Sequence, residues 1–170
     1  MVGRPAERNA QLLATAYHEA GHAIAGDALG LTVMEVSVAA GQGSLGRCCF
    51  LETPDTDEFL EKRQIAKLAG AEAQRHIMPG YDGVGASSDM LSAVDGQARR
   101  YGIADLHVAE AQMAEWSERA RALVQANLEV IHVLARVLVE RGTLGGEQFH
   151  MALNEARARV AEDRRLLGLD

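Results

Sequence analysis

Aromatic residues and cysteines are both scarce in this sequence, and each scarcity excludes something. Only 4% of the 170 residues are aromatic while 48% are apolar, so the core has to be built from Leu, Val, Ile, Ala and Met. The 2 cysteines, Cys48 and Cys49, are adjacent and cannot form the paired Cys-x-x-Cys ligands of a structural zinc site. Adjacent side chains on a strand point to opposite faces. We therefore expect one thiol packed inward, the other exposed, and no redox role.

A basic surface and a long apolar run are also missing. The net charge is -7 and the basic clusters ARR and DRR are interleaved with acids, which argues against nucleic-acid binding, because phosphate recognition needs clustered Lys and Arg. No apolar run is long enough to span a bilayer, and the opening residues MVGRPAERNA lack the hydrophobic stretch of a signal peptide. These absences predict a cytoplasmic protein with no nucleic-acid partner and no membrane segment.

The apolar pattern predicts a mainly α fold with a small β-sheet (α+β). The length fits one domain over 1–170, with a core over about 7–156 and a charged helical tail over 157–170. Gly30 and Gly142 stand where helices are expected to end. We predict helices over 7–29, 53–78, 87–102, 110–141 (one long helix or a pair) and 143–167, and a hairpin of strands over 31–40 and 43–52.

An apolar stripe runs through the segment 110–141. Such a stripe normally faces the core of its own chain; the alternative is that part of it forms an interface between copies. We expect the core to be its main use. The stripe consists of Leu123, Val124, Leu128, Ile131, Leu134 and Leu138.

The segment TAYHEAGHAIAG, Thr15 to Gly26, carries the chemistry. On a helix, residues four apart share a face, so His18 and His22 can present ring nitrogens to one metal ion, and imidazole is a good zinc ligand. Glu19 follows His18 and can reach a water on the metal without being a ligand. The metal would lower the pKa of that water to about 7, and Glu19 would take its proton and pass it to the leaving amine. The pattern predicts zinc-dependent peptide hydrolysis.

A catalytic zinc needs a third protein ligand, and the residues alone leave its identity open. Metzincins would have histidine at position 28, where this chain has Ala28. Glu72 and Asp89 are the candidate carboxylates; Asp89 follows a glycine- and serine-rich loop, where a helix start favours an ionised carboxylate. The remaining histidines are expected to be surface or packing residues; they are His76, His107, His132 and His150.

Several blocks of the sequence together resemble the peptidase domain of the FtsH family of ATP-dependent zinc metalloproteases. The resemblance extends from about Ala14 to Ala156. It implies a zincin-like helical domain in which His18, His22 and Asp89 bind zinc and Glu19 is the base. It also implies that an edge strand around 46–51 pairs with an extended polypeptide substrate, and that the chain is a hexamer. The blocks, in family order, are TAYHEAGHAIAG, LTVMEVSV, GSLGRCCF, KLAGAEAQRHI, GASSDMLSAVDGQARRYG and TLGGEQFHMAL.

The chain departs from the family in two respects. The block GGRAAEE reads AGAEAQR here, so Gln74 and Arg75 replace two glutamates, the first of which helps to orient the zinc site in the family. An amide brings no negative charge, which predicts lower activity. The family's AAA ATPase and membrane anchor are not found either: GQGSLGRC, residues 41–48, has Arg47 and Cys48 in place of the phosphate-loop Lys and Ser/Thr, and we interpret it as a hairpin turn.

Two functions are consistent with these patterns. The first is a zinc endopeptidase acting on unfolded or flexible polypeptides, alone or supplied by a separate AAA ATPase. The second is a zinc-stabilised, non-catalytic adaptor or ring-forming module for such an ATPase, motivated by the missing motor and the altered AQR segment. We favour the peptidase, because an adaptor would have no use for Glu19 beside the metal.

Overall fold

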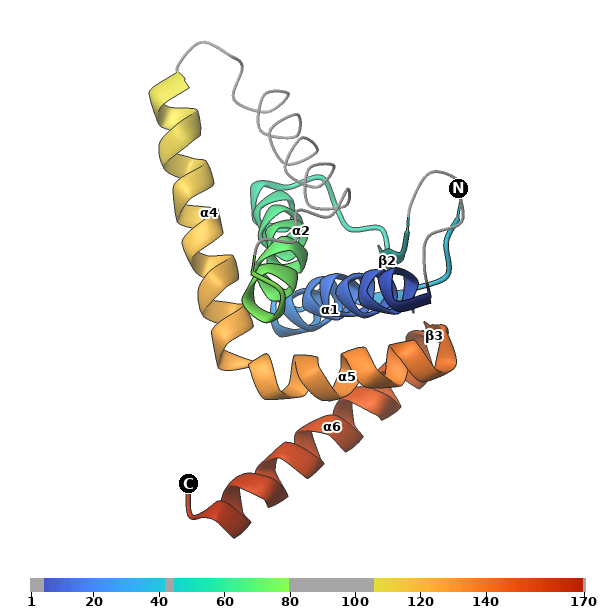
Figure 1. Cartoon of the computed structure of the whole chain (residues 1–170). Helices are drawn as coiled ribbons and strands as arrows, with labels where there is room; N and C mark the ends of the chain where they lie inside the picture. Colours follow the sequence, from blue (N-terminus) through green and yellow to red (C-terminus); the bar gives the residue numbers. More distant parts are fainter. Residues whose placement is uncertain (1–4, 42–44, 80–105, 170) are drawn as a thin grey trace.

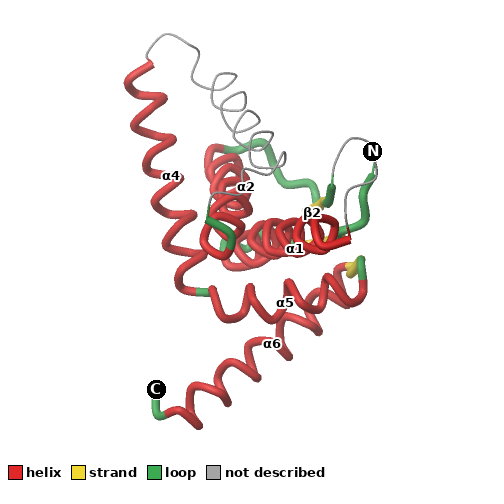
Figure 2. Tube along the Cα trace, viewed as in Figure 1, coloured by secondary structure: helices red, strands yellow, loops and turns green. Residues whose placement is uncertain are grey.

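The computed structural model describes residues 5–41, 45–79 and 106–169, and these form a mainly helical α+β fold. The predicted helix over 87–102, with Asp89, lies outside the described residues. Figures 1 and 2 show the arrangement. The elements are α1 (Pro5–Ala28), β1 (Val33–Ser37), β2 (Arg47–Phe50), α2 (Asp57–Ile77), α4 (Leu106–Ala126), α5 (Leu128–Arg141), β3 (Thr143–Gly145) and α6 (Gly146–Leu167).

Helix α1 is the centre of the fold and packs against both α2 and α5 (Figure 1). Small residues let α1 and α2 approach closely: a Cβ added at Gly21 would lie 2.6 Å from the Cβ of Ala73 and 2.7 Å from the carbonyl oxygen of Ala69. As predicted, α1 ends at a glycine in the left-handed conformation, because Gly30 has φ 78°. Helix α2 begins at Thr56, whose hydroxyl accepts a hydrogen bond from the Phe59 amide.

The segment 110–141 is a pair of helices and not one continuous helix. Helices α4 and α5 are bent by 78° at Asn127. The side chain of Asn127 turns back to donate a hydrogen bond to the Leu123 carbonyl, at 2.9 Å. Most of the predicted apolar stripe lies in the core of its own chain, as expected; its fully buried members are Val124, Ile131, Leu134 and Leu138.

The predicted hairpin is part of a three-stranded antiparallel sheet in the order β2-β1-β3. Val36 in the central strand pairs with Cys48 on one side and Leu144 on the other. The third strand was missed, because Thr143–Gly145 is short and its glycines look like the start of a helix. Its pairing is reinforced by a 2.7 Å hydrogen bond between the hydroxyls of Ser37 and Thr143. Strand β2 is therefore an edge of this sheet.

Phe149 joins α6 to the core, and its removal should be costly. Its side chain is 0% exposed and belongs to the same apolar cluster as Val36 and Leu144. We predict that Phe149→Ala lowers the free energy of unfolding by about 3–5 kcal/mol, since the cavity cannot close fully. Urea denaturation measures this. Met151→Ala, on the same helix at 64% exposure, is the control and should change stability by less than about 0.5 kcal/mol.

The helices of the described residues differ in length and in hydropathy. None of them is by itself both long and apolar enough to cross a bilayer, although the bent pair Glu110–Ala126 and Leu128–Arg141 passes when taken together, by length and composition only.

Candidate metal centre

His18, Glu19 and His22, which we call the zinc motif because the sequence predicts that they form a zinc site, lie together on the buried middle of α1. His18, Glu19 and His22 are 5%, 6% and 7% exposed. The two imidazole rings are 4.5 Å apart between centroids and nearly perpendicular, at 88°. Four-residue spacing on a continuous helix thus brings both rings to one side, as the sequence predicted.

A backbone contact from α2 sets the orientation of the second imidazole. The Nδ1 atom of His22 lies 2.8 Å from the carbonyl oxygen of Ala66. A carbonyl can only accept, so Nδ1 must carry the proton, and the lone pair of the neutral ring is then on Nε2. Metal-bound histidines are commonly held in this way, with the second nitrogen donating to a carbonyl or a carboxylate. The donor chemistry of His22 therefore fits a zinc ligand.

Gly70 makes room for the His22 ring one turn further along α2. A Cβ added at Gly70 would lie 2.5 Å from Nε2 and 2.7 Å from Nδ1 of His22. Any larger residue would have to displace the ring. The sequence reasoning did not assign a role to Gly70 or Ala66; the run of small residues in AKLAGAEA was the available signal, because it marks a face where another element approaches closely.

The edge strand β2 and the residues leading into it cover the other side of the motif. A Cβ added at Gly46 would lie 2.7 Å from Oε1 of Glu19 and 2.7 Å from Cγ2 of Thr15. Cys48, two residues on and within β2, is close enough to Glu19 to feel the charge of its carboxylate. Glu19 on α1 therefore lies next to the backbone that leads into the edge strand β2.

The two cysteines differ as predicted, because Cys48 is half-buried and Cys49 is exposed. Burial raises the pKa of the Cys48 thiol well above its usual range, and the negative charge of Glu19 adds to the effect. Thiolates are the reactive form. We predict that iodoacetamide at pH 7.5 modifies Cys49 at least about ten times faster than Cys48. Peptide mass spectrometry resolves the two sites, and equal rates would contradict the placement of Cys48 against Glu19.

The alternative carboxylate Glu72 is engaged elsewhere. It forms ion pairs with Arg75 at 2.6 Å and with Arg121 at 3.7 Å. Gln74 is buried, and Arg75 is exposed. Asp89 lies outside the described residues, within which no group of three or more metal-binding side chains is found. The third ligand therefore stays a prediction.

The other histidines were expected to be surface or packing residues, and the structure describes the side chains of three of them. His76, His132 and His150 are exposed. His132 also has a packing role, because its Nδ1 forms a hydrogen bond with the hydroxyl of the buried Tyr17. Burial raises the pKa of Tyr17, and Arg136 partly opposes this. The bond ties α1 to α5 immediately before the first motif histidine.

No protein-family model matches the chain, and no curated protein matches it either.

Proposed function

We propose that this chain is a zinc metalloendopeptidase that hydrolyses unfolded or flexible polypeptides. The observation that supports this most is the buried turn of α1, where the His18 and His22 rings face a common side and Glu19 lies beside them. The His22–Ala66 contact adds to it, because it leaves Nε2 of His22 with its lone pair. A packing role alone would not need a carboxylate and two imidazoles on one buried turn.

The proposed roles follow from the chemistry of the side chains. His18 and His22 hold the ion, with Asp89 as the third ligand by resemblance to the FtsH family. Zinc bound there would supply a Lewis acid for the peptide carbonyl and lower the pKa of a water. Glu19 would serve as the general base, taking a proton from the attacking water and giving it to the leaving amine.

We propose that substrate binds as an additional strand along β2. An edge strand has backbone N–H and C=O groups to offer an extended peptide. Among the described residues β2 meets this requirement, because it pairs with β1 on one side only, and the residue before it, Gly46, lies beside Glu19. Folded proteins cannot supply an extended strand, so a separate AAA ATPase would be needed to unfold them.

Zinc analysis and a cleavage assay test the function together. The purified chain should hold about one zinc per protomer, cleave casein, and lose that cleavage when a chelator removes the metal. A stably folded substrate should resist. Absence of zinc would contradict the proposal. So would stoichiometric zinc whose removal lowers the melting temperature of a chain that cleaves no peptide, since that result describes the adaptor.

A further inference from the structure

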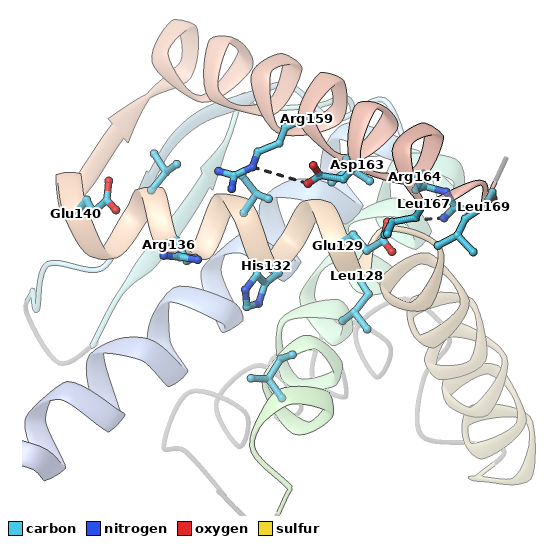
Figure 3. Close-up of a pocket in the computed structure, with 14 residues that line it drawn as sticks. Leu128, Glu129, His132, Arg136, Glu140, Arg159, Asp163, Arg164, Leu167 and Leu169 are labelled. Carbon is cyan, nitrogen blue, oxygen red and sulfur yellow. Dashed lines mark hydrogen bonds and ion pairs between the residues drawn. The ribbon is translucent and has the colours of Figure 1, made fainter.

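A groove of about 630 Å³ lies between α5 and the C-terminal half of α6 (Figure 3). Its apolar α5 side chains lie at the margin of the core, since Leu128, Val133 and Val137 are partly buried and pack against the core cluster. Its apolar lining includes Val133 and Val137 from α5 and Val160 and Leu167 from α6. This groove is distinct from the histidine pair, which faces α2.

The charges around the groove are balanced. Three arginines, Arg136, Arg159 and Arg164, are matched by three carboxylates, Glu129, Glu140 and Asp163, as Figure 3 shows. Two pairs are formed within the chain: Arg159 with Asp163 at 4.0 Å and Arg164 with Glu129 at 3.7 Å.

This balance restricts the partner. A polyanion or an anionic membrane needs an excess of basic residues, which the groove lacks. An apolar surface with equal numbers of both signs can instead face an identical surface, because neither copy repels the other. Within the described part of the chain, Arg136 and Glu140 make no ion pair, which leaves one charge of each sign to match a partner.

The end of α6 offers the apolar side chains that such a groove would receive. Leu166, Leu167 and Leu169 are 73%, 72% and 57% exposed, a concentration of large apolar groups that is unusual on a free surface. Leu167 and Leu169 also line the groove. The side chains that would be inserted and the surface that would receive them therefore belong to one patch. Two-fold symmetry requires this of an interface, because each copy must give what it receives.

We propose that the groove between α5 and α6 binds a second copy of this chain, with the last turn of α6 of each copy seated in the groove of the other. Of the apolar stripe of α4 and α5, Leu128 lines the groove; Val124, Ile131, Leu134 and Leu138 are buried in the core and are not available for this contact. The inference does not depend on the peptidase function.

Sedimentation equilibrium of the full chain over a wide concentration range tests the proposal. Leu167→Glu and Leu169→Glu should each raise the dimer dissociation constant at least about 30-fold, because each removes a large apolar side chain from the contact with the groove valines and puts a charge in its place. Leu169 follows the end of α6, so its substitution replaces no residue of the helix itself. Met151→Glu, an equally exposed position on α6 outside the groove, is the matched control and should behave as the wild type.

Each result of the sedimentation experiment either supports or overturns the dimer interface. A wild-type dimer that both leucine variants weaken and the Met151 variant does not, with unchanged circular dichroism, supports the interface. A wild type that remains monomeric overturns it and leaves the groove for a different protein. Self-association of any order, a hexameric ring included, that survives both leucine substitutions also overturns it. Zinc content and casein cleavage report separately on the peptidase.

Discussion

Replacing Glu19 with glutamine should lower the kcat for casein hydrolysis by about 10²–10⁴-fold and leave the zinc content unchanged. The amide has nearly the same shape as the carboxylate, so it can keep the packing against Gly46 and Thr15. It cannot accept a proton from water at neutral pH. The loss should therefore be in the chemical step and not in metal binding or folding.

The matched control is Glu58→Gln, which makes the same chemical change at a carboxylate that is 71% exposed and pairs with Lys62 on α2. It should retain wild-type activity. Turnover and zinc content of both variants are measured on the same preparations. Cleavage that survives in the Glu19 variant would remove Glu19 as the base.

Replacing Gly70 with alanine should weaken zinc binding by about 10–100-fold, the range seen when the support of a metal ligand is removed. Alanine normally stabilises a helix interior by about 1 kcal/mol relative to glycine, so a defect would have to come from the new methyl group. That group would lie 2.5 Å from Nε2 of His22 and force the ring away. Competition with a zinc-sensitive dye gives the affinity.

Gly26→Ala is the corresponding control on α1. The three atoms nearest to its added Cβ would all belong to the Phe50 ring, with Cε1 the closest and Cζ at 2.5 Å, so its clash would be with β2 and not with the His22 ring. It should reduce stability without a comparable loss of zinc affinity per folded molecule. If both variants bind zinc as the wild type does, the space that Gly70 leaves for the His22 ring is not needed for zinc binding, and our description is wrong.

Local signals in the sequence were sufficient for the elements with a strong period. The helix of the zinc motif and the hairpin were both predicted near their true positions, because apolar spacing and terminal glycines such as Gly30 are local properties. The third strand was missed, since Thr143–Gly145 is extended only through its pairing with β1. Long-range pairing of this kind leaves no periodic trace in three residues.

The candidate site likewise contains residues that local spacing predicts and residues that only long-range packing brings together. The motif on α1 could be recognised from spacing alone, and the structure shows its three residues buried together. The supports of the site come from distant parts of the chain: the Ala66 carbonyl and Gly70 from α2, and Gly46 before β2. No spacing rule connects these positions, because they meet only when the helices and the sheet pack.

We propose above all that one zinc ion is bound by His18, His22 and Asp89. A crystal structure of the zinc-loaded chain, with the metal identified by anomalous scattering at the zinc edge, tests it most directly. We expect the ion at about 2.0–2.2 Å from a ring nitrogen of each histidine and from a carboxylate oxygen of Asp89. An ion bound elsewhere, or an imidazole pair that no carboxylate approaches, would contradict the account.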